Sequence, residues 1–290
     1  MDDKKDGIQL GRVIESIENK LRPLTESFEL LFKTYKQFEA QFKPVLDIIL
    51  NCEERFLDFR ERLSKNFERL LKGIERFSKD FPESTRKVSF ILGKYGWYVS
   101  WNMELVATYE LAELLIGKDF EKVDLWMADY YTNQLDNIQK DLLYKFPSRA
   151  KILNRAFGAH TRAEYELSIP VFLSQADGIC QEIIGIQLYC KKNGKPETAK
   201  FVEQLVSDSL MIALLEPMRN PMPISANSIE RKQYSDSFNF LNRHAILHGE
   251  SIDYGTKINS LKAISLISYI GTVLLEAARE GSNKSDASNR

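Results

Sequence analysis

A long apolar repeat near the start of the chain constrains the fold most strongly. Apolar side chains recur there at alternating spacings of four and three residues, sixteen times in succession. This is the period of an α-helix with one buried stripe, and a strand would instead alternate every second residue. The repeat comprises Leu10, Ile14, Ile17, Leu21, Leu24, Phe28, Leu31, Tyr35, Phe38, Phe42, Val45, Ile49, Cys52, Phe56, Phe59 and Leu63.

Two prolines interrupt this repeat without occupying its apolar positions. Pro23 and Pro44 both take an outward position, where they kink a helix or divide it into shorter helices;. We therefore predict an N-terminal arm over residues 1–82, built as a helical bundle or a kinked coiled coil. It serves either dimerisation and partner sensing or simply the packing of an elongated helical domain. A break at Phe81-Pro82 then leads to a second helical domain, 83–280, and a polar tail, 281–290, that we expect to be disordered;. The predicted fold class is all-α.

Composition narrows the class of protein. The net charge is −1, so no global field attracts the chain to nucleic acid or membranes, and any such contact needs a local patch;. The three cysteines lack metal-type spacing and indicate a reducing compartment;. No apolar signal core opens the chain, and the longest apolar windows are too short or too interrupted to span a bilayer. We expect a cytoplasmic protein with no membrane contact.

Several later segments carry readable local signals. Trp97, Tyr98 and Trp101 form an aromatic cluster that we assign to the core in preference to base stacking;. A predicted helix over 169–189 leads into Lys191-Lys192-Asn193-Gly194-Lys195-Pro196, whose lysines suit a helix C-terminus better than a phosphate contact;. The proline-rich stretch 216–228 reads as a long loop beside the site. A last amphipathic helix covers 257–279.

The densest group of chemically active residues lies at Arg243-His244-Ala245-Ile246-Leu247-His248. Apolar spacing predicts a helix from Phe238 to His248, and Gly249 is a natural residue to end it, since only glycine enters the left-handed region cheaply. On a regular helix Arg243 and His248 would point about 140° apart. They converge only if the helix ends at His248 or if a partner chain completes the site.

Three chemistries compete for this segment. His244 and His248 stand four residues apart, which suits two metal ligands, but the chain offers no matching third ligand;. Neither a nucleophile elbow nor a glycine-rich phosphate loop is present. Metal-free phosphodiester cleavage remains, with imidazole moving protons and the guanidinium holding the phosphate. The alternative is that these side chains only brace a turn by hydrogen-bonding carbonyls.

The hexapeptide resembles the arginine, polar residue, three spacers and histidine of the HEPN superfamily, a group of all-helical domains. The likeness covers about residues 147–280 and excludes the N-terminal arm. It implies a metal-independent endoribonuclease acting as a bacterial toxin or anti-phage effector, without cofactors. In that picture Arg243 binds phosphate, His248 is the general acid or base, and His244 assists, although asparagine or aspartate is commoner than histidine at its position.

The resemblance also bears on partners and supporting residues. It implies an RNA substrate, a homodimer or higher homo-oligomer with paired motifs, and an antitoxin or defence partner protein. Some members are inactive, so the alternative is a non-catalytic helical module that recruits a partner or nucleotide. Supporting roles are expected for Asn242, Tyr254, His160 and Asp177. Arg155 precedes His160 by five residues, and we interpret that pair as coincidental or structural.

Overall fold

The computed structural model describes residues 83–100, 102–205, 210–232 and 241–288. The chain divides into two compact units, and the larger one, Thr85–Val206 with Met211–Arg290, carries the candidate site. The predicted N-terminal arm over 1–82 lies outside the described residues. Its assignment as a bundle or a coiled coil therefore stays a prediction.

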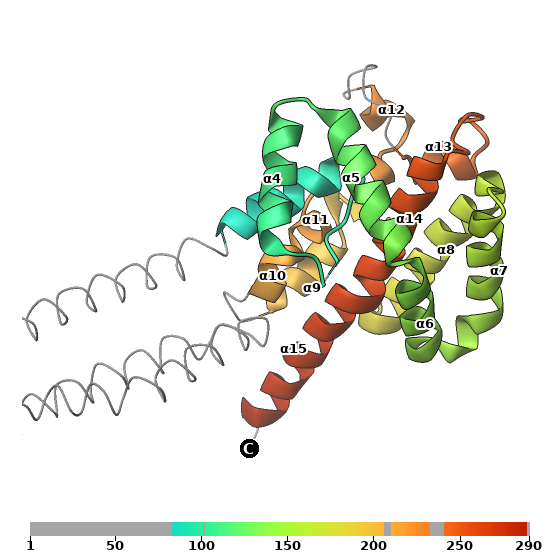
Figure 1. The fold of residues 1–290 in the computed structure, drawn as a ribbon. Helices are drawn as coiled ribbons and strands as arrows, with labels where there is room; N and C mark the ends of the chain where they lie inside the picture. Colours follow the sequence, from blue (N-terminus) through green and yellow to red (C-terminus); the bar gives the residue numbers. More distant parts are fainter. Residues whose placement is uncertain (1–82, 101, 206–209, 233–240, 289–290) are drawn as a thin grey trace, which may run out of the picture. The chain divides into compact units, whose positions relative to one another are not determined.

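The described residues are mostly helical, which confirms the predicted all-α class (Figure 1). A helix over 83–94 comes first. The labelled elements are α4 (Leu105–Ile116), α5 (Phe120–Asn133), α6 (Leu135–Lys145), η3 (Pro147–Arg149), α7 (Ala150–Thr161), α8 (Tyr165–Ile184), β1 (Lys191–Lys192), β2 (Lys195–Pro196), α9 (Thr198–Gln204), α10 (Leu210–Leu214), α11 (Glu216–Arg219), η4 (Pro223–Ser225), α12 (Ser228–Arg231), α13 (Arg243–Leu247), α14 (Lys257–Tyr269), the π-helical turn η5 (Ile270–Leu274) and α15 (Leu275–Ser288).

One continuous helix, formed by α14, η5 and α15, organises the larger unit (Figure 1). It packs against α8 and α5, and α7 packs on the other side of the hairpin that it forms with α8. Every residue from Asn259 to Tyr269 is buried, as expected of a helix surrounded by others;. Gly271 in the π-helical turn lets α6 approach closely, since a Cβ there would lie 2.5 Å from Leu142 Cδ2.

The same helix has the length and composition of a membrane span. Over Lys257–Gly281, however, 83% of the most apolar window is buried inside the protein. A core helix has these features as well, so they are weak evidence for a membrane. It is the one such helix among the residues that the structure describes.

The aromatic cluster lies in the core but does not open a helix. Trp97 and Tyr98 are buried in an extended segment that follows the helix over 83–94. Trp97 stacks on Tyr131 and donates a hydrogen bond from Nε1 to Asp124. Trp101 lies outside the described residues. The core assignment is therefore confirmed for the first two residues.

The lysine-rich tract differs from its prediction. Helix α8 already ends at Gly185, in the left-handed region at φ 71°, because glycine there allows the backbone to turn back;. The lysines instead form the antiparallel hairpin β1–β2, with Lys192 opposite Lys195. Asn193 (φ 53°) and Gly194 (φ 77°) make the turn, and positive φ at both positions is the signature of a type I′ hairpin;.

Two further segments differ from the predictions. The stretch 216–228, expected as a loop, contains α11 and η4, each with a proline in its first turn, where a missing N–H leaves no helical bond unmade;. The tail expected to be disordered from 281 onward continues α15 to Ser288.

Candidate functional site

Helix α13 is a single turn and a half held at its start by Asn242. The side chain of Asn242 accepts a hydrogen bond from the Ala245 N–H at 2.7 Å, which is the standard cap for a helix N-terminus;. Its amide nitrogen donates to the carbonyls of Pro223 at 2.7 Å and Ala226 at 2.9 Å. Asn242 is buried and extended, so the helix predicted from Phe238 does not run through it. The stretch 223–226 thus borders the site.

Helix α13 ends where the sequence predicts. Leu247 is its last residue, His248 is the C-cap, and Gly249 adopts φ 71°. The N–H groups of Glu250 and Ser251 return to the carbonyl of Ala245 at 2.8 and 3.1 Å, which closes the end of the helix;. This termination leaves the His248 side chain exposed at the surface.

The two histidines lie together. The ring centroids of His244 and His248 are 4.3 Å apart, with the ring planes tilted by 40°. The Nδ1 of His244 lies 3.6 Å from Glu250 Oε1, just beyond a hydrogen bond, while Arg231 binds the other oxygen of that carboxylate. Glu250 therefore faces both a histidine of the motif and a cation of α12.

Arg243 takes a different direction. Its guanidinium carbon lies 5.3 Å from the ring centroid of Tyr189, a residue between α8 and the hairpin, in cation–π geometry;. Its Nε is buried without a hydrogen-bond partner among the described residues. Within one chain, the structure therefore brings His244 and His248 together and places Arg243 on Tyr189.

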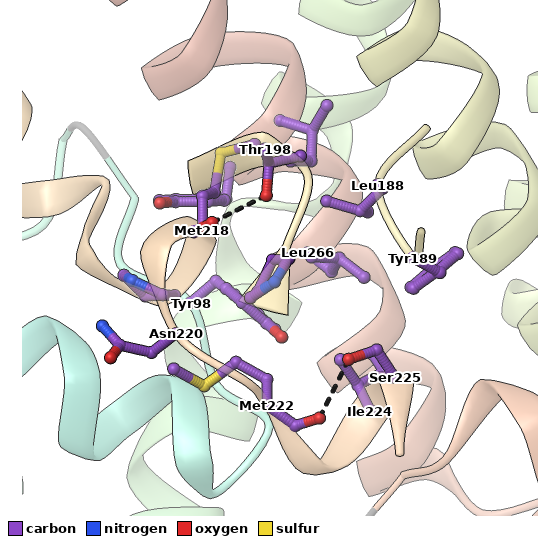
Figure 2. Close-up of a pocket in the computed structure, with 14 residues that line it drawn as sticks. Tyr98, Leu188, Tyr189, Thr198, Met218, Asn220, Met222, Ile224, Ser225 and Leu266 are labelled. Atoms are coloured by element: carbon purple, nitrogen blue, oxygen red, sulfur yellow. Dashed lines mark hydrogen bonds between the residues drawn. The ribbon is translucent and has the colours of Figure 1, made fainter. Parts of the chain in front are cut away.

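Tyr189 joins Arg243 to a small cavity (Figure 2). The lining is largely apolar and aromatic, with Tyr98, Met218, Met222 and Leu266 among its members. The volume open to water inside it is about 30 Å³, enough for only one or two water molecules;. The cavity is thus a packing defect beside the site and does not hold a nucleotide as it stands.

A chain of ion pairs runs from the hairpin to the histidines. Lys191 Nζ lies 2.6 Å from Glu230 Oε2, and Glu230 also completes the capping box of α12 with Asn227. Burial by itself raises the pKa of Glu230, but the bonds from Lys191 and the Asn227 N–H outweigh it and hold that pKa below its usual value. Arg231 then binds Glu250, which faces His244.

Tyr254 has a structural task at the start of α8. Its hydroxyl donates to the carbonyl of Glu166 at 3.0 Å. Pro170 lies four residues after Glu166 and has no N–H, so that carbonyl lacks its helical partner;. Tyr254 supplies the missing donor and fixes the loop between α13 and α14 to α8.

Asp177 and His160 also bind elsewhere. Asp177 accepts the N–H of Leu188 at 2.7 Å and so shapes the segment after α8. His160 is buried, and its Nδ1 lies 2.7 Å from Ser260 Oγ, which in turn lies 2.9 Å from Ser168 Oγ. Burial, with a smaller contribution from Lys257, lowers the pKa of His160 to about 4. Arg155 is exposed on a surface groove of α7, so the two do not form a second site.

Sequence reasoning missed Tyr189, Arg231 and the ion pair between Lys191 and Glu230. No local signal marks them, since Tyr189 and Arg243 are distant in sequence and meet only through the packing of α13 on α8. The metal reading also lacks further ligands: among the described residues, no three His, Cys, Asp or Glu side chains gather closely enough to hold an ion.

Comparison with known proteins identifies no relative: no family model, curated protein or solved structure matches the chain.

Proposed function

We propose that the chain is a metal-independent endoribonuclease whose reactive residues are His248 and Arg243. The observation that carries the proposal is the end of α13. Gly249 stops the helix at φ 71°, and His248 is left exposed with the ring of His244 4.3 Å away. An exposed imidazole with a second one beside it suits proton transfer to and from a bound substrate. The resemblance of the hexapeptide to HEPN domains points the same way.

The chemistry needs no group beyond these side chains. A ribose 2′-hydroxyl attacks the adjacent phosphorus, forms a 2′,3′-cyclic phosphate and breaks the bond to the 5′-oxygen of the next nucleotide. One imidazole accepts the proton of the 2′-hydroxyl, and another group returns a proton to the departing 5′-oxygen. The Arg243 guanidinium stabilises the charge that develops on the phosphate oxygens.

The direction of Arg243 favours a site built from two copies of the chain. In one chain its guanidinium rests on Tyr189, whereas the histidines face Glu250. Large apolar side chains near the histidines are exposed, namely Ile229 at 73%, Leu247 at 39% and Ile252 at 90%. A second copy covering them would place two arginines and two pairs of histidines along one cleft. The biological setting that we propose is a cytoplasmic toxin or anti-phage effector.

The test is cleavage of RNA by the full-length protein in the presence of a chelator. We expect products with 2′,3′-cyclic phosphate ends, and at least a hundredfold slower cleavage by Arg243→Ala and by His248→Ala, as is typical when a proton-transfer or phosphate-binding group is removed. Arg155→Ala is the matched control, because Arg155 is exposed and also stands five residues before a histidine. Expression of the wild type should arrest growth, and both site variants should relieve the arrest.

The opposite result supports the non-catalytic alternative. If the purified chain cleaves no RNA with or without metal ions, and Arg243→Ala and His248→Ala behave as wild type in cells, the nuclease is wrong. The segment then recruits a partner or nucleotide, with Arg243 held on Tyr189 as part of the fold.

A further inference from the structure

The hairpin β1–β2 concentrates positive charge beside the candidate site. It contributes Lys191, Lys192 and Lys195 within five residues, around the rigid Asn193-Gly194 turn. A type I′ turn matches the natural twist of the strands, so the two lysines nearest the turn are presented by a well-defined backbone. The sequence-based explanation for these lysines was the end of a helix. That explanation is wrong, because α8 ends at Gly185.

Two of the three lysines have no structural explanation. Lys191 is paired with Glu230. Lys192 and Lys195, by contrast, are exposed and lie directly opposite each other in the hairpin register. Like charges at directly opposed positions destabilise a pair of strands. Among the residues that the structure describes, no carboxylate forms an ion pair with either of them, so the charge that would compensate this pair comes from outside the described fold.

The hairpin is anchored to the candidate site by two separate routes. Along the chain, Tyr189 precedes Lys191 by two residues, and its ring carries the guanidinium of Arg243. Through side chains, Lys191 binds Glu230 on α12. The neighbouring Arg231 binds Glu250, which faces His244.

We propose that Lys192 and Lys195 bind the phosphate backbone of a single-stranded RNA segment and guide it toward Arg243 and His248. The identity of the ligand rests on the proposed function, which requires an RNA strand at α13. A net charge of −1 provides no global attraction, so a local pair of lysines is the kind of feature by which this chain gains affinity for a polyanion;. Lysines on a hairpin read phosphate, and hence orient the strand without selecting its sequence.

The test measures binding separately from cleavage. The probe is a fluorescent 2′-O-methyl RNA oligonucleotide, which cannot be cut because its 2′-oxygen is blocked, and the readout is anisotropy with full-length protein at several salt concentrations. For Lys192→Ala/Lys195→Ala, the slope of log affinity against log salt should fall by about 1.4, at about 0.7 per phosphate contact on a single strand. This corresponds to about 25-fold weaker binding at 0.1 M salt.

The matched control is Lys140→Ala/Lys151→Ala, which removes the same charge from exposed positions on α6 and α7. It should keep the wild-type slope. On cleavable RNA, the hairpin variant should raise KM and leave kcat within about twofold, since the lysines bind substrate and transition state alike. Near-ultraviolet circular dichroism identical to wild type shows that the hairpin change leaves the fold intact.

The outcomes separate this inference from the proposed function. If no RNA is cleaved but the wild type binds the probe with a slope that depends on the hairpin, the nuclease fails and the lysine hairpin stands. If cleavage needs Arg243 and His248 but the hairpin variant binds like the control, the hairpin inference is overturned and the nuclease stands. Absence of any RNA binding by the wild type, or equal affinity for a duplex of the same sequence, overturns the single-strand assignment.

Discussion

Asn242 offers the sharpest test of how the candidate site is held in place. It is buried, and one side chain caps α13 and binds two carbonyls of the 223–226 segment. Replacing it with alanine removes the cap, which costs about 1 kcal/mol. It also leaves two buried carbonyls without donors, at about 1–2 kcal/mol each. The free energy of unfolding should therefore fall by about 3–5 kcal/mol in Asn242→Ala.

Urea unfolding followed by tryptophan fluorescence measures this loss. All three tryptophans belong to the larger unit, so the signal reports the unit that contains α13. The midpoint of thermal unfolding should fall by about 10 °C, at about 2–4 °C per kcal/mol for a domain of this size. Asn242→Asp keeps the capping oxygen but loses both donors, so it isolates the two bonds to Pro223 and Ala226.

The matched control is Asn227→Ala. Asn227 caps α12 in the same way, with its side chain accepting from the Ile229 and Glu230 N–H groups at 2.9 Å, but it is exposed. Water replaces its bonds, so its loss should stay near 1 kcal/mol. If Asn242→Ala costs no more than Asn227→Ala, the buried amide does not hold α13 and the reasoning is refuted.

Two further predictions concern residues that the structure moves away from catalysis. The pKa of His160 in the folded state, about 4, lies below the unfolded value near 6.5, so protonation favours unfolding; stability is unaffected above pH 6.5 and declines as pH falls toward 4, by about 3 kcal/mol in total;. Urea midpoints at pH 7, 5.5 and 4.5 should show this decline in the wild type, and a parallel decline in His160→Gln would contradict it. Tyr254→Phe should cost about 1–2 kcal/mol through the orphaned Glu166 carbonyl;. In a Pro170→Ala background, which restores the missing N–H, the same change should cost less than half as much, and an unchanged cost in this double-mutant cycle would show that the hydroxyl does not replace the lost helical bond.

Local backbone features of this chain were predictable because a few neighbouring residues determine them. Gly249 ends α13, and the Asn193-Gly194 pair makes a turn, in both cases because positive φ is cheap for those residues;. The burial of Trp97 followed from its apolar surface. The start of α13 was wrong for a related reason. Apolar spacing ran on through Leu241 and Asn242, but the Asn242 amide gains more by binding carbonyls of a distant segment than by joining a helix;.

The candidate site shows the limit of the same reasoning. His244 and His248 come together because residues four apart share one face of a helix;. Arg243 goes to Tyr189, and His160 turns inward to Ser260, through contacts that join distant parts of the chain. The lysines of the hairpin also changed meaning once α8 was seen to end at Gly185.

The sequence by itself therefore determined the helical class, the end of α13 and the pairing of the two histidines. Each depends on the period of the helix or on the φ preference of a single residue. Only the tertiary structure decided which way Arg243 points, what Asn242 and Tyr254 hold, and which lysines remain without a partner. Those outcomes depend on which distant groups packing brings within hydrogen-bonding or ionic distance, and a one-dimensional pattern carries no record of that distance.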